Sequence, residues 1–215
     1  MRAAAAGGCL LALVAAGHAW TQQPVPGRRA AAPAKPDWEF ALTAYPTQVR
    51  GGDNTTSAIG AADRGPLHLE ARYGYEAKDS RSAFVGWTFS GGEGLAWEIT
   101  PLLGGGWGPA GTFIPGVEAS LAWGRVDFYV EGEFVRDREG SSGNYNYAWS
   151  ELGLRAFPWL RAGLAGQRTR AYGGDREFQR GPFVQATFGR VTAGGYWFNP
   201  GAGDQVVVAS IGVAF

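Results

Sequence analysis

The sequence of 215 residues contains little sulfur and few charges. It has one cysteine, Cys9, and one methionine. A chain with a single thiol forms no internal disulfide, which excludes a disulfide-stapled secreted domain. Charged residues make up only 18% of the chain, and the 19 basic residues balance the 19 acidic ones. This balance gives no electrostatic basis for binding nucleic acid, and we expect no nucleic-acid partner.

A hydrophobic run long enough for a membrane-spanning helix is also missing. The apolar stretch 3–16 follows a short positive start and falls below the roughly 20 residues that such a helix needs. Gly17 and Ala19 then supply small residues at the two positions that a signal peptidase reads. We therefore predict a signal peptide over 1–19, cleaved after Ala19. The Pro- and Ala-rich segment 20–37 has no periodicity and is predicted to be a disordered periplasmic lead-in.

Glycine and aromatic residues, in contrast, are abundant. The chain has 35 glycines in 215 residues, about 16% against a usual share of roughly 7%. From Trp38 onward, apolar and polar residues alternate with a period of two, and no convincing helical period interrupts them. In the segment 67–77, for example, Tyr73 and Tyr75 fall on the apolar face, and Arg72 falls on the polar face. The pattern predicts an all-β chain.

Twelve such segments can be delimited, which is an even number, as closed bacterial barrels require. Spread over 38–215, they leave about fifteen residues for each strand and its connection, enough for the 9–11 of a tilted spanning strand. The polar segment 54–63 is included because both chain ends then lie on the periplasmic side; ten strands is the alternative. The predicted strands lie near 38–48, 54–63, 66–77, 81–91, 94–104, 111–123, 125–136, 145–157, 159–171, 179–189, 190–199 and 205–215.

Alternation alone does not distinguish a water-soluble barrel from one embedded in lipid, but three further features favour lipid. Aromatic residues gather at strand ends, tight connections alternate with long polar ones, and an apolar alternating segment ends at Phe215. That last segment resembles the signal by which the barrel-assembly machinery recognises Gram-negative outer-membrane proteins. We therefore expect a closed antiparallel transmembrane β-barrel in the cell outer membrane, surrounded by its lipids and lipopolysaccharide. The predicted lipid-facing or interfacial residues are Trp87, Trp97, Trp123, Phe128, Phe134, Trp159 and Phe215.

The opposite face of the same strands carries the charges. Carboxylates on consecutive strands predict an acidic lumen wall, with arginines facing it. Two interpretations remain open: a salt-bridge network that fills the interior and fixes the strand register, or a field across a narrow aqueous pore with weak cation preference. The predicted lumen residues are His68, Glu70, Arg72, Glu98, Glu118, Asp127, Glu131, Glu133, Glu151, Arg155 and Arg161.

Two further sequence features, a glycine motif and a histidine, give less support for a functional site. The segment 106–111 has the G-x-G-x-x-G spacing of dinucleotide-binding proteins, but Pro109 and a following strand pattern indicate a hairpin loop. His68 is the only histidine after the signal peptide. A Ser–His enzyme acting on lipids would place it near an activated serine at the outer rim, whereas the strand order places His68 near the periplasmic side. We expect a hydrogen-bonded lumen histidine, no catalytic residue, no metal site and no cofactor.

Several stretches resemble a family of uncharacterised, porin-like β-barrel proteins of the proteobacterial outer membrane. They are 63–76, 97–108, 129–137, 149–172 and 179–191. The resemblance implies the barrel and its location, and it supplies no substrate or catalytic residue. Our first functional hypothesis is a passive, non-enzymatic channel for small polar or ionic solutes. The alternatives are a plugged structural or interaction barrel that supports envelope integrity and, with less support, a lipid-modifying enzyme.

Overall fold

The computed structural model describes residues 37–215, except 76–78, 109–110, 141–142 and 172–175. The predicted signal peptide and nearly all of the predicted lead-in lie outside the described residues. In the described part of the chain, no helix is long and apolar enough to cross a membrane. The strands are β1 (Glu39–Val49), β2 (Thr55–Arg64), β3 (Leu67–Tyr73), β4 (Arg81–Trp87), β5 (Phe89–Gly91), β6 (Ala96–Trp107), β7 (Thr112–Trp123), β8 (Val126–Asp137), β9 (Tyr145–Phe157), β10 (Leu160–Ala171), β11 (Arg176–Phe188), β12 (Val191–Phe198) and β13 (Val206–Ala214).

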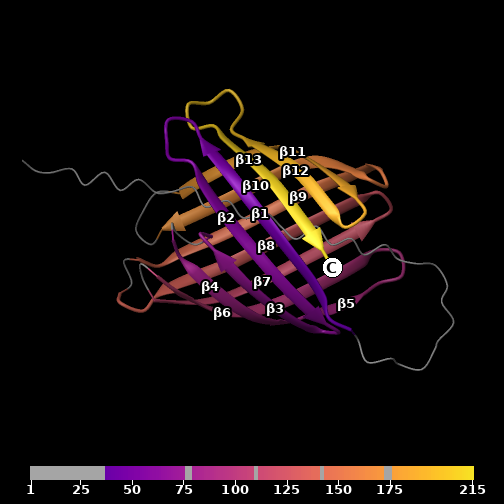
Figure 1. The fold of residues 1–215 in the computed structure, drawn as a ribbon, viewed down its shortest axis with the longest axis horizontal. Helices are drawn as coiled ribbons and strands as arrows, with labels where there is room; N and C mark the ends of the chain where they lie inside the picture. Colours follow the sequence, from indigo (N-terminus) through magenta and orange to yellow (C-terminus); the bar gives the residue numbers. More distant parts are fainter. Residues whose placement is uncertain (1–36, 76–78, 109–110, 141–142, 172–175) are drawn as a thin grey trace, which may run out of the picture.

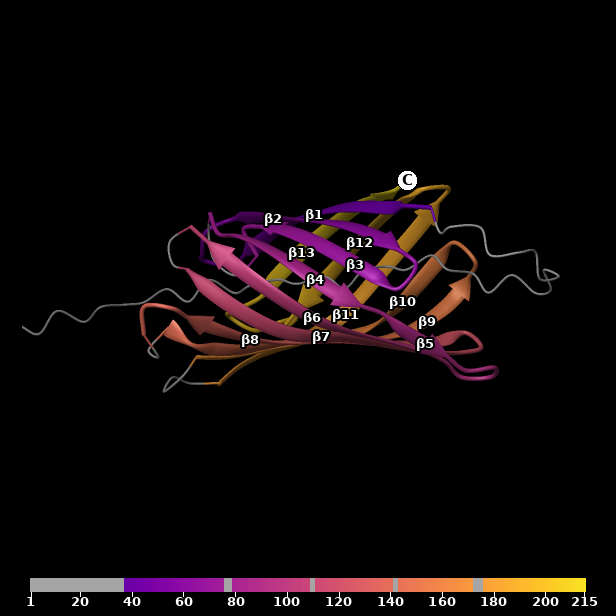
Figure 2. The same cartoon turned by 90° about the horizontal axis from the view of Figure 1, so that it is seen from below.

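Twelve of these strands form one closed antiparallel ring, seen from two directions in Figures 1 and 2. Neighbours in sequence pair with each other, the first strand β1 pairs with the last strand β13, and β4 pairs with β6. The seam between β1 and β13 runs from Ala41 opposite Ala214 to Val49 opposite Val206. The predicted closed barrel of twelve strands is confirmed, and each predicted segment overlaps one strand of the ring.

The short strand β5 stays outside the ring because it continues the line of β4 along the same partner, β6. Gly86 pairs with Leu102 and Phe89 with Ile99, so the register is unchanged across the gap. Pro101 lies opposite the gap and has no N–H to donate, which interrupts the backbone ladder there. The predicted single strand 81–91 is therefore two strands in one line.

The two ends of the barrel differ in their connections. At the end that we call the short-turn end, four hairpins have two-residue turns, at 65–66, 124–125, 158–159 and 189–190. In three of these turns a glycine takes the left-handed conformation that tight hairpins require, with φ of 58° at Gly65, 59° at Gly124 and 62° at Gly189. At the opposite, loop end, the connections have four to seven residues. Such a difference is typical of outer-membrane barrels, whose periplasmic turns are short.

The outer face of the barrel is apolar. Aliphatic side chains such as Leu152 and Leu164 project from the middle of the strands and are more than half exposed. Aromatic side chains form a girdle at each end, with Trp123 and Trp159 at the short-turn end and Trp107 at the loop end. This is the surface of a barrel that contacts hydrocarbon. Of the predicted lipid-facing residues, six are 37–71% exposed on this face, namely Trp87, Trp97, Trp123, Phe128, Trp159 and Phe215, and Phe134 is half-buried there.

The inner face is packed rather than hollow along much of its length. Trp149, Phe198, Val206 and Val208 have no exposed surface. They belong to a cluster of buried, mostly aromatic residues that also contains Tyr45, Tyr75, Tyr129, Tyr147, Phe183 and Tyr196. A second, smaller cluster consists of Phe84, Leu102, Ile114 and Val135. The core of this protein therefore lies within the ring.

Candidate functional site

The predicted lumen residues all fall on the inner face of the ring, at different levels of burial. Arg155 is exposed at the short-turn end, and Glu98, Asp127 and Arg161 are partly buried. The other seven are only 1–5% exposed: His68, Glu70, Arg72, Glu118, Glu131, Glu133 and Glu151. Buried charges are stable only when they are paired and hydrogen-bonded, so their partners define the site.

Arg72 is the centre of the first set of partners, which we call the Arg72 cluster. Its Nε donates to Glu70 of the same strand, β3. Its Nη1 donates to Glu133 Oε1 at 2.6 Å, and Nη2 lies 3.1 Å from Glu131 Oε1, both on β8. Figure 2 shows β3 and β8 in facing walls of the barrel. The Arg72 cluster therefore ties two walls together across the interior.

Aromatic rings enclose the same guanidinium. Its central carbon lies 4.2 Å from the ring centroids of both Tyr75 and Phe84, within the range of cation–π attraction. The Tyr75 hydroxyl donates to Glu131 Oε1 at 2.9 Å, so the ring that packs on Arg72 also holds one of its carboxylate partners. Gly104 makes room for the Phe84 ring, since a Cβ there would lie 2.2 Å from Phe84 Cδ1.

Arg161 is the centre of a second set, the Arg161 cluster, nearer the short-turn end. Its Nε donates to Asp127 Oδ1 at 2.8 Å, and its Nη1 donates to Glu151 and, at 2.9 Å, to Gln185 Oε1. These residues come from β8, β9, β10 and β11, which are consecutive in the ring. The Arg161 cluster therefore runs along one wall instead of crossing the interior.

The carboxylate of Glu151 is held by aromatic donors as well. Its Oε1 accepts from the Trp149 indole N–H at 3.1 Å and from the Tyr196 hydroxyl at 2.9 Å. Gly153, on the same strand, leaves room for the pair formed by Arg161 and Asp127. A Cβ at this position would lie 2.5 Å from Arg161 Nε and 2.7 Å from Asp127 Oδ1.

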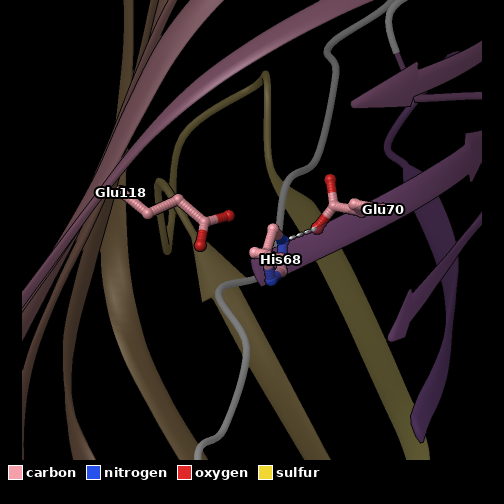
Figure 3. A group of neighbouring side chains, drawn as sticks. All are labelled: His68, Glu70 and Glu118. Atoms are coloured by element: carbon pink, nitrogen blue, oxygen red, sulfur yellow. Dashed lines mark ion pairs between the residues drawn. The ribbon is translucent and has the colours of Figure 1, made fainter. Parts of the chain in front are cut away.

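His68 lies next to the Arg72 cluster, in contact with carboxylates. It faces Asp63 across the β2–β3 hairpin, and its Nδ1 is 2.7 Å from Asp63 Oδ1. Its Nε2 is 3.9 Å from Glu70 Oε2. Glu118 reaches toward the same imidazole from β7, as Figure 3 shows.

One prediction about this interior is wrong, and other contacts could not be predicted. Tyr75 was assigned to the apolar outer face, but it is buried inside, next to Arg72. The cause is Gly74, whose positive φ of 62° ends the alternation of β3 one residue earlier. The sequence does contain this signal, because a glycine in a strand pattern often marks such a bend. The contacts of Phe84, Gly104 and Gly153 depend on the register between neighbouring strands, which spacing along one strand does not reveal.

Comparisons with known proteins identify the fold. No family model matches the chain, and no curated protein matches it in sequence. Among solved structures, the KdgM porin superposes with a TM-score of 0.57 at 6% identity, covering 81% of this chain and 98% of that one. The same porin in complex with disordered oligogalacturonate gives the same values. OccK5 of Pseudomonas aeruginosa gives a TM-score of 0.44 at 11% identity, with 83% of this chain and 67% of that chain covered.

The similarity to the KdgM porin shows that this chain has the fold of an outer-membrane porin. The fold is therefore that of a transmembrane β-barrel with an apolar exterior and a charged, aromatic interior. The resemblance to a particular family of proteobacterial barrels stays a prediction, because no family model matches.

Proposed function

We propose that this protein is a passive, porin-like channel of the Gram-negative outer membrane that conducts small cations. The porin fold and the lipid-facing exterior support the location. In this orientation the short-turn end faces the periplasm, lipopolysaccharide surrounds the loop end, and the strand ending at Phe215 is the part that the barrel-assembly machinery recognises. The protein is not an enzyme in this proposal, and His68 belongs to the charged interior.

The observation that carries this proposal is the excess of carboxylates on the inner face. Two guanidinium groups, Arg72 and Arg161, are paired there. The carboxylates around them and around His68 are more numerous: Asp63, Glu70, Glu98, Glu118, Asp127, Glu131, Glu133 and Glu151. A lumen with such an excess attracts cations and repels anions, as rings of Asp and Glu do in cation channels.

The burial of the Arg72 cluster supports a narrow passage. The cluster crosses the interior between β3 and β8, and its charged side chains are almost fully buried. Partly exposed carboxylates, Asp63 and Asp127 among them, lie nearer the short-turn end. We expect monovalent cations to enter from that side and to pass the Arg72 cluster only when its side chains move. The unit conductance is therefore small, and solutes of sugar size do not pass.

Planar-bilayer recordings test the proposal. In a tenfold KCl gradient, the reversal potential should have the sign of a cation-selective pore. The double variant Arg72→Gln with Glu133→Gln removes one positive and one negative charge from the crossing and leaves its net charge unchanged. We expect this variant to raise the unit conductance several-fold. Arg136→Gln, the same substitution at an exposed arginine on the outer face near the loop end, is the matched control and should leave the conductance close to the wild-type value.

The packed interior favours one alternative, a plugged barrel with a structural or interaction role. Trp149, Phe198, Val206 and Val208 lie inside the ring with no exposed surface, as in a filled core. The recordings separate the two functions. Folded wild-type protein and folded double variant that both stay at the background conductance would contradict the channel and support the plugged barrel. An anion-selective reversal potential would contradict the proposed role of the carboxylates.

A further inference from the structure

Three potential metal ligands converge inside the barrel beside the Arg72 cluster. His68 and Glu70 project from β3, and Glu118 projects from β7 on a facing part of the wall (Figure 3). One nitrogen or oxygen atom from each of the three side chains lies within 4.8 Å of the other two. All three residues are buried, with exposed fractions of 1–4%. Two elements distant in sequence thus form one small polar site.

The orientation of the imidazole fits a ligand role. Histidines that bind metals generally donate their other ring N–H to a carboxylate, which fixes the ring and its tautomer. Here Asp63 Oδ1 lies 2.7 Å from Nδ1, in a pair that the β2–β3 hairpin places directly opposite each other. Nε2 then points toward the carboxylate of Glu70, 3.9 Å away. Asp63 is therefore a positioning residue.

The donor set and the dimensions match a borderline divalent ion. One imidazole nitrogen and two carboxylate oxygens are ligands that Zn²⁺ takes in four-coordinate sites. With bonds of about 2.0–2.2 Å, two ligand atoms of a tetrahedral Zn²⁺ are roughly 3.3 Å apart. The observed 3.9 Å between His68 Nε2 and Glu70 Oε2 needs only a small side-chain movement to reach that spacing. We infer that His68, Glu70 and Glu118 form a Zn²⁺ site that links β3 to β7 across the interior.

The surrounding charge also favours a cation at this place. Arg72, the nearest guanidinium, donates to Glu70 and is shared with Glu131 and Glu133, so its single charge faces three carboxylates. Asp63 and Glu118 add further negative charge. Glu98, which is half-buried, is close enough to His68 and Asp63 to interact with both. These carboxylates provide an acidic approach from the short-turn end, which raises the local concentration of cations.

No pattern along the chain predicted this site. It offers a single histidine after the signal peptide, no cysteine near it, and carboxylates that the inward-facing pattern already explains. The site needs Glu118, fifty residues away, and only the closed ring brings it to His68. Binding of Zn²⁺ is independent of conduction, so each can be present without the other.

Calorimetric titration of the full folded chain in detergent micelles with Zn²⁺ tests the inference, with heat-dependent gel mobility as the check on folding. We expect one Zn²⁺ per chain. His68→Asn retains a donor near Asp63 but removes the nitrogen that faces Glu70, and Glu118→Gln removes one carboxylate. Each should weaken binding by more than about 100-fold, and Asp63→Asn by about tenfold. Glu177→Gln, a partly buried inner-face carboxylate near the loop end, is the matched control and should change the affinity less than threefold.

Two further measurements guard against misfolded variants and nonspecific binding. X-ray absorption of the Zn²⁺-loaded wild type should show a single imidazole among oxygen ligands. Zn²⁺ should also raise the thermal unfolding temperature of the wild type more than that of Glu118→Gln. Absence of binding by the folded wild type at millimolar Zn²⁺ would overturn the inference. So would equal affinity of the wild type and both ligand variants, or a zinc spectrum without imidazole.

Discussion

Arg72 and Arg161 are the same residue type on the same inner face, yet their surroundings differ. Arg72 is fully enclosed, contacts three carboxylates and lies between two aromatic rings. Arg161 keeps 13% of its side chain exposed, contacts two carboxylates and packs on the single ring of Phe183. The first joins facing walls of the ring, and the second joins neighbouring strands of one wall.

The two arginines represent two kinds of buried ion pair, one along a wall of the barrel and one across its interior. The pairs of Arg161 along one wall join strands that the backbone ladder already holds together, β9 and β10 directly and β8 and β10 through β9. A pair across the interior connects strands that share no backbone hydrogen bond, so it adds a link between walls that the ladder does not supply. Arg72 and its carboxylate partners are more completely shielded from water than Arg161 is. Loss of the Arg72 charge therefore leaves buried carboxylates that water can hardly solvate. The two arginines should therefore respond differently to the same substitution.

The largest effect is expected at Arg72. Arg72→Met keeps most of the side-chain volume but leaves Glu70, Glu131 and Glu133 buried without their shared cation. We expect the free energy of unfolding to fall by about 3–5 kcal/mol. Urea titration of the barrel in lipid vesicles, followed by tryptophan fluorescence, measures this value. Adding Glu133→Gln to Arg72→Met should restore part of the lost free energy of unfolding. If Arg72→Met destabilises the barrel no more than Arg155→Met does, the ion pairs across the interior are not important for stability.

A smaller effect is expected at Arg161. Arg161→Met leaves Asp127 and Glu151 without a guanidinium, but Asp127 is partly exposed and Glu151 keeps its bonds from Trp149 and Tyr196. We expect a loss of about 1–2 kcal/mol in the same urea titration, between the values typical of exposed and of buried pairs. If Arg161→Met destabilises the barrel as much as Arg72→Met does, the contrast between crossing and lateral pairs is wrong.

The smallest effects are expected from the phenols that complete each cluster. Tyr75→Phe removes one hydrogen bond to Glu131, and Tyr196→Phe removes one to Glu151. Each carboxylate keeps another partner, the ion pair with Arg72 in the first case and the indole N–H of Trp149 in the second. We therefore expect similar losses of about 0.5–1.5 kcal/mol for the two variants. A much larger loss of free energy of unfolding for Tyr75→Phe would show that this hydroxyl contributes substantially to the stability of the Arg72 cluster.

The fold could be predicted because its signals are local. The period of two, the glycine turns and the aromatic residues at strand ends act over a few residues and located most of the strands. The polar strand β2 was predicted instead from a property of the whole ring, the even number of strands that places both chain ends on the periplasmic side. The same signals missed two details of the strands. Pro101 interrupts the ladder of β4 from the neighbouring strand β6, and Gly74 turns Tyr75 inward, so a pattern read along one strand missed both effects.

The interior could be predicted only in part, because alternation tells which face a side chain occupies and not what it meets there. The pairing of Arg72 with Glu133 depends on the width of the ring and on the stagger between strands, which are properties of the closed barrel. The same holds for Glu118 and His68. Whether the interior is packed or open depends on how rings such as Trp149 and Phe198 fill it, and composition does not determine that arrangement.

The seam between the first and last strands makes assembly dependent on the end of the chain. Residues 206–214 of β13 provide hydrogen-bond partners for both β1 and β12. Before β13 is in place, β1 and β12 each have an edge with unpaired backbone N–H and C=O groups. In hydrocarbon, each such unsatisfied group costs several kcal/mol. A nascent chain lacking this strand therefore has no stable state within the bilayer, and the barrel can close there only after the last strand has been made.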